Sequence, residues 1–169
     1  MKKFYLIIVF VLMNISVLFA QRVTEGSLSP LKGQHKVNLE FDFSQAVMHG
    51  MDEEHFRTYE EDWDEDKPEV VGLLSGEAAK RCNNNFYLGQ FSNTDFSIKI
   101  IVREISTQGS FRCDGALIDK EGKQLAFFTG FHGRGGKCGS KLNLIKDGAK
   151  RTGANIGNVF NSEFKKLNH

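Results

Sequence analysis

The alternation of apolar and polar residues predicts four strands. Residues 37–43 alternate strictly, with apolar side chains at the odd positions and polar side chains at the even positions. A period of two residues is typical of a strand that is buried on one side. Three further strand-like runs follow one another along the chain, at 96–105, 111–118 and 124–132. Short glycine-containing turns separate these runs, which favours an antiparallel meander.

Apolar spacings of three and four residues predict helices elsewhere. The acidic segment 52–66 carries an aromatic stripe, and the segment 70–82 has apolar residues on one side. Pro68 lies between the two segments and is expected to interrupt the helix. A longer helix is expected over 142–164, with Ser140 as its N-cap.

This order of elements predicts an α+β fold of two layers. The sheet is expected to be mainly antiparallel, with about four strands and with the helices packed on one face. The first strand can join a later one by a right-handed crossover through the helices. Residues 37–169 are expected to form a single domain. The polar segment 21–36, which contains Gly26, Pro30 and Gly33, is expected to be a surface leader.

The turns also predict which side chains share a face of the sheet. In the predicted register, the numbers of two paired residues add up to about 217 across the first turn and about 242 across the second. This register places the apolar side chains of the three strands on one face of the sheet. The predicted core face comprises Ile98, Ile100, Val102, Phe111, Cys113, Leu117, Leu125, Phe127 and Phe131. The opposite face carries the charged residues Lys99, Arg103, Arg112 and Asp114 together with the apolar residues Ile101, Ala116, Ile118, Ala126 and Phe128.

The opposite face carries more apolar residues than is usual for a face that contacts solvent. Ile101, Ile118 and Phe128 are therefore a candidate surface for a partner protein or a homodimer. Partial cover by the leader 21–36, or a scatter of exposed apolar residues without a binding role, is an equal alternative.

The first twenty residues have the pattern of a secretory signal peptide. Lys2 and Lys3 precede an apolar run that begins at Phe4, and Ala20 supplies a small residue for cleavage. An uncleaved membrane anchor is the alternative, but the uninterrupted run is short against the roughly 20 residues of a membrane span. Gln21 follows where a lipoprotein would have a cysteine, so no lipid anchor is expected. We therefore expect an exported protein, periplasmic or secreted.

Cleavage changes the charge of the chain. Removing Lys2 and Lys3 leaves 20 basic residues against 21 acidic ones, a net charge of −1. A nearly neutral chain has no global attraction to nucleic acid or to an anionic membrane. We therefore expect no nucleic-acid partner. No second apolar run is long enough to span a bilayer, so we also expect no stable membrane insertion after cleavage.

Three cysteines remain in the mature chain: Cys82, Cys113 and Cys138. An exported protein can form disulfides, and an odd count leaves one thiol unpaired within the chain. A Cys82–Cys113 bond is the preferred pairing, and Cys113–Cys138 is the alternative. Their spacings match no zinc or redox motif, and no metal or cofactor is expected.

The glycine-rich loop before the last helix is the candidate ligand site. Its residues combine backbone N–H groups with positive charge at a helix start, which suits an anion. The candidate residues are Arg134, Gly135, Gly136, Lys137, Ser140 and Lys141. The loop does not match the phosphate-binding motif G-x-x-x-x-G-K-[ST]. A flexible connection kept soluble by charge is the alternative.

No catalytic residue is predicted. Asp62, Asp64 and Asp66 resemble the opening of a calcium loop, but Lys67 and Leu73 then occupy its glycine and glutamate positions. The histidines are scattered, and no serine lies in a G-x-S-x-G elbow. Dispersed glycosidase carboxylates remain an alternative, since they need not be close in the chain.

The layout resembles that of uncharacterised exported domains of Gram-negative bacteria. The matching segments are 37–43, then 115–126, and then 156–160 at the end of the long helix. The layout is also similar to envelope domains such as the N-terminal domain of TolB and CsgG-like proteins. The resemblance covers roughly residues 28–165 and implies no catalytic residue.

We therefore expect an exported binding or envelope-assembly protein without catalytic activity. Its partner would be an unknown protein or envelope component, and binding to a host protein is a further possibility. The alternative is a secreted hydrolase that acts on envelope or host glycans through dispersed carboxylates.

Overall fold

The computed structural model describes residues 22–82 and 86–167. The predicted signal peptide, 1–20, lies outside these residues. The elements in chain order are β1 (Arg22–Gly26), a 3-10 turn (Ser29–Leu31), β2 (Lys36–Asp42), β3 (Val47–Met48), α2 (Glu53–Tyr59), α3 (Trp63–Arg81), β4 (Tyr87–Gly89), β5 (Phe96–Ile105), β6 (Phe111–Asp119), β7 (Gln124–Gly133) and α4 (Lys141–Leu167).

The predicted α+β class is confirmed, but the sheet is larger and more mixed than expected. Seven strands form it, in the order β1-β7-β6-β5-β2-β4, with β3 beside β5. β5, β6, β7 and β1 are antiparallel, whereas β2 runs parallel to both β4 and β5. β3 and β4 span only two and three residues, too few to show an alternating pattern, and the five residues of β1 include a single large apolar side chain, Val23.

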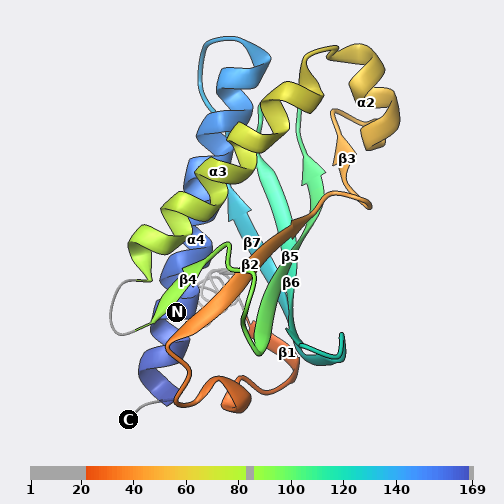
Figure 1. The fold of residues 1–169 in the computed structure, drawn as a ribbon. Helices are drawn as coiled ribbons and strands as arrows, with labels where there is room; N and C mark the ends of the chain where they lie inside the picture. The colour runs from red at the N-terminus through yellow and green to blue at the C-terminus, as the bar shows by residue number, and fades with distance from the viewer. Residues whose placement is uncertain (1–21, 83–85, 168–169) are drawn as a thin grey trace, which may run out of the picture.

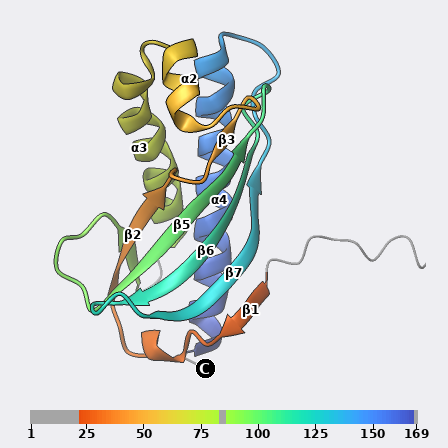
Figure 2. The same cartoon turned by 90° about the vertical axis from the view of Figure 1, so that its right-hand side faces the viewer.

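The two long helices pack on one face of the sheet (Figures 1 and 2). α4 buries a stripe that includes Ile145, Ala149, Ile156 and Phe160. Such a stripe along one side is the expected pattern for a helix that covers a core. In the described parts of the chain no helix lies on the other side of β5, β6 and β7, which we call the open face (Figure 2).

Two β-bulges in β7 change the predicted faces of this strand. Ile118 pairs with Gln124, as the predicted register requires, but Leu117 then pairs with Ala126. The extra residue, Leu125, shifts the register by one, and a shift of one reverses every side chain that follows. Phe128 is therefore only 3% exposed and packs against Phe160 of α4 at 5.5 Å between ring centroids.

The position of Phe128 corrects the predicted partner surface, since this side chain belongs to the core. A second shift, between Phe128 and Phe131, restores the parity, so that Phe131 faces the core as predicted. Across the first turn, Ile98 pairs with Leu117 and Val102 with Cys113. This register differs by two from the prediction, and a shift of two preserves the faces.

The segment that we expected to be a surface leader contributes to the sheet and to the core. β1 pairs with β7 at the edge of the sheet, from Arg22 opposite Thr129 to Gly26 opposite Ala126. Leu28 and Leu31, which follow, are 5% and 2% exposed. Their burial contributes to stability, at roughly 1.5–3 kcal/mol for each fully buried leucine.

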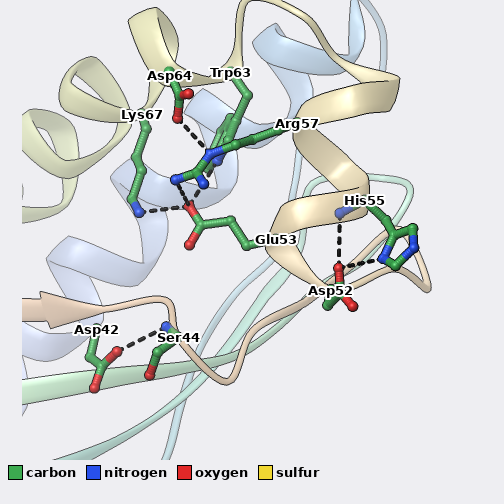
Figure 3. Close-up of polar contacts among 9 residues, drawn as sticks. All are labelled: Asp42, Ser44, Asp52, Glu53, His55, Arg57, Trp63, Asp64 and Lys67. Carbon is green, nitrogen blue, oxygen red and sulfur yellow. Dashed lines mark hydrogen bonds and ion pairs between the residues drawn. The ribbon is translucent and has the colours of Figure 1, made fainter.

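The break between α2 and α3 falls at residues 60–62 and not at Pro68, which lies inside α3. The turn lets Phe56 pack edge-on against Trp63, with 5.3 Å between the ring centroids. Glu53 fixes this arrangement, because it accepts hydrogen bonds from the Trp63 indole at 3.0 Å and from Lys67 at 2.6 Å (Figure 3).

Candidate functional site

Internal contacts hold the glycine-rich loop. The Gly135 N–H donates to the Ser110 hydroxyl at 2.9 Å, and the Gly136 N–H donates to the Leu144 carbonyl at 3.2 Å. The Arg151 guanidinium donates to the Arg134 carbonyl at 2.8 Å and also to that of Gly135. These bonds use the N–H groups of Gly135 and Gly136, so neither is available to an anion.

The start of α4 is likewise occupied by protein contacts. Ser140 accepts a hydrogen bond from the Asn143 N–H at 3.3 Å, which confirms its predicted role as a cap. Lys141 donates to the Glu60 carboxylate at 2.7 Å and to the Tyr59 hydroxyl at 2.6 Å. Its hydrogen bonds to Glu60 and Tyr59 raise the pKa of Lys141. This lysine therefore joins α4 to the end of α2.

A cavity of about 410 Å³ lies beside the loop, on the open face of the sheet. Its charged and polar lining residues are Arg103, Ser110, Arg112, Asp114, His132 and Arg134. Phe111, Cys113, Phe131, Gly130 and Gly133 complete the lining. Of the six residues predicted for the ligand site, only Arg134 lines this cavity. Ser140 and Lys141 line another one, described below.

Irregular pairing on both sides of β6 shapes this cavity. The register of β5 against β6 shifts at Arg103, and the register of β7 shifts opposite Asp114. Gly130 lies in the second bulge with a φ of 90°, a conformation that favours glycine. Bulges redirect side chains and are common beside functional sites. Sequence alternation placed Arg103, Arg112 and Asp114 on this face, but it could not show that bulges gather them.

The charges around this cavity are partly neutralised. Arg103 donates to the Asp114 carboxylate at 2.8 Å and to the side-chain oxygen of Gln45. Arg112 forms an ion pair with Glu104. Arg134 is exposed, and no carboxylate of the described residues forms an ion pair with it. The guanidinium of Arg134 is therefore the least neutralised cation of this site.

Beyond the cavity, this side of the sheet carries a further ion pair. Lys99 on β5 meets Asp42 on β2 at 2.7 Å, and hydrogen bonds from Lys99 and Ser44 lower the pKa of Asp42 to about 2. Ile101 and Ile118 are half-buried. With Phe128 in the core, these two isoleucines are what is left of the predicted partner surface.

All three cysteines are free thiols, so the predicted Cys82–Cys113 disulfide is not formed. Cys82 ends α3, whereas Cys113 lies on β6 opposite Val102. Burial raises the pKa of Cys82 to about 12 and raises the pKa of Cys113 further. Only Cys138 is exposed. Buried thiols with a raised pKa are poor nucleophiles, because the thiolate is the reactive form.

A second cavity, of about 340 Å³, lies where α2 and α3 meet the start of α4. Glu60, Asp62 and Asp66 contribute three carboxylates to its lining. Lys141 neutralises Glu60, as described above. Over the described ranges 22–82 and 86–167, no group of three acidic, histidine or cysteine side chains is arranged to hold a metal ion.

Comparisons with known proteins place this chain in no family. No family model matches it, and no curated protein matches it. A dodecamer of a PelC point variant from Paraburkholderia phytofirmans has a TM-score of 0.43 and 10% identity, and the match covers 81% of this chain and 98% of that one. A second PelC crystal form from the same organism gives 0.41 and 10%, with coverage of 80% and 96%. Among the described helices, none combines the length and the hydropathy needed to cross a bilayer.

Proposed function

We propose that the mature chain is an exported, non-catalytic protein that binds a ligand or an envelope component through the cavity on its open face. The observation that carries this proposal is the cavity between the register shifts at Arg103 and opposite Asp114. Its lining includes Arg112, His132 and Arg134. Its volume lies within the range of about 300–1,000 Å³ that is usual for small-molecule sites.

The chemistry of the lining supports binding more than catalysis. The single carboxylate, Asp114, is held by Arg103, and the single thiol, Cys113, is buried with a raised pKa. A glycosidase needs two carboxyl groups across the scissile bond, and a cysteine nucleophile needs an accessible thiolate. The lining instead offers guanidinium groups, which bind and orient ligands.

The proposal is tested by mixing the purified ¹⁵N-labelled protein with soluble glycopeptide and oligosaccharide fragments of the bacterial envelope. We expect saturable amide shifts at Arg112, His132 and Arg134, while mass spectrometry finds the fragments unchanged. Shifts confined to the cavity beside Glu60 and Asp62, or cleaved fragments, would refute the proposal.

The second cavity favours one other function, the hydrolysis of glycans. Three carboxylates and the cation of Lys141 line it, and paired carboxylates are the usual machinery of glycosidases. Chromogenic glycosides test this alternative directly. Hydrolysis by the parent protein would establish this function if the Asp62→Asn and Asp66→Asn variants both lose the activity and keep the melting temperature of the parent.

A further inference from the structure

We infer that the open-face cavity takes a small ligand that carries an oxyanion group on an apolar body, with Arg134 as its principal anion-binding side chain. This inference rests on the proposed function, because it assigns the chemical class of ligand for the same cavity.

The charges favour an anion. Three arginines line the cavity against a single aspartate, and His132 adds an imidazole. Asp114 and Glu104 offset Arg103 and Arg112, which leaves the charge of Arg134 in excess. A guanidinium presents a planar fork of N–H donors that matches a carboxylate or a phosphate with two parallel hydrogen bonds.

The backbone beneath Arg134 is held in place. Arg151 of α4 donates to the carbonyl groups of Arg134 and Gly135, and the Gly135 N–H donates to Ser110. Ser110 itself lines the cavity. Less conformational entropy is then lost when the Arg134 side chain binds a ligand, because its main chain is already ordered.

The size of the cavity excludes a bare ion as its full occupant. Its volume of about 410 Å³ compares with the roughly 30 Å³ that one water occupies in the liquid. An inorganic phosphate would leave most of this space to water. The rest of the lining is uncharged and includes two glycines, so that a ring or a short chain attached to the oxyanion would fill the space better than water alone.

Isothermal titration calorimetry with four probes tests the inference. Phenyl phosphate and benzoate carry the two oxyanions on the same ring, benzyl alcohol is their neutral counterpart, and inorganic phosphate lacks the ring. We expect at least one aromatic anion to bind more than tenfold more tightly than benzyl alcohol and inorganic phosphate. The anion with the higher affinity then shows whether the site prefers a phosphate or a carboxylate group.

One arginine variant and one lysine variant show where the anion binds. Arg134→Ala should weaken binding of the preferred anion by roughly ten- to a hundredfold, the usual range for a lost charge-assisted hydrogen bond. Lys137→Ala is the matched control, since Lys137 is an exposed cation of the same loop that does not line the cavity. It should change the affinity less than threefold. Both variants should keep the melting temperature of the parent protein.

Three outcomes would overturn the inference. Equal affinity for benzyl alcohol, or an unchanged affinity in Arg134→Ala, would refute an anion site and leave the proposed binding function standing. Failure of all four probes would refute the ligand class assigned here. The proposed function would then depend on the separate titration with envelope fragments.

Discussion

The contact between α3 and α4 depends on two glycines of α4, and Gly153→Ala tests it. A Cβ atom at Gly153 would lie 2.3 Å from the Leu74 carbonyl oxygen of α3, and one at Gly157 would lie 2.3 Å from that of Ala78. Closest ordinary approaches of carbon to a carbonyl oxygen are about 3.3 Å. A side chain at either position therefore requires the helices to separate by about 1 Å.

The expected cost of Gly153→Ala follows from this separation. A gap of 0.5–1 Å already removes about a quarter to a half of the dispersion energy of each contact, and overpacking typically costs about 1–3 kcal/mol. Replacing a helical glycine by alanine returns up to about 1 kcal/mol of helix propensity. We therefore expect a net destabilisation of about 1–2 kcal/mol.

Gly76→Ala on α3 is the matched control, because, apart from its chain neighbours and its own helix backbone, no atom of the described residues lies within 4 Å of a Cβ at that position. This variant should be stabilised by about 0.5–1 kcal/mol. Urea unfolding followed by circular dichroism measures both changes. A Gly153→Ala variant as stable as the parent protein, or a destabilised Gly76→Ala variant, would refute this account of the helix contact.

Two further predictions concern thiols and acid. Of the three cysteines, Cys138 alone should react rapidly with a thiol reagent in the folded protein, because Cys82 and Cys113 are buried with a raised pKa; three equally fast thiols would contradict the buried positions. Because the Lys99 hydrogen bond lowers the pKa of Asp42 to about 2, the stability from this pair should be complete above about pH 4 and lost as the pH falls toward 2. The Asp42→Asn variant should lose that acid dependence, so its melting temperature should fall less between pH 5 and pH 2.5 than that of the parent protein. An equal fall in both proteins would contradict this prediction.

The core of the meander could be predicted because its alternation is strong. β5 matches its predicted range of 96–105, and the predicted core residues Ile98, Ile100 and Val102 are each 0% exposed. The long helix was equally clear, since its apolar residues recur at three and four. These elements carry their pattern within one continuous segment.

The misplaced elements depend on contacts that a local pattern does not contain. Leu125 and Gly130 each lie in a bulge, and one extra residue in a strand is invisible to a count of alternating positions. β4 is three residues long and is defined by its pairing with β2, far away in the chain. The candidate site was missed for the same reason, since the register shifts at Arg103 and opposite Asp114 bring Arg103, Asp114 and Arg134 to one cavity.

The most direct test of the central claim is the location of a bound anion. In separate titrations of the ¹⁵N-labelled protein with phenyl phosphate and with benzoate, we expect at least one of the two anions to cause saturable amide shifts at Ser110, Arg112, His132 and Arg134, which surround the open-face cavity. Shifts restricted to residues 136–142, at the start of α4, would place the anion in the glycine-rich loop. That result, or the absence of saturable shifts, would contradict the account.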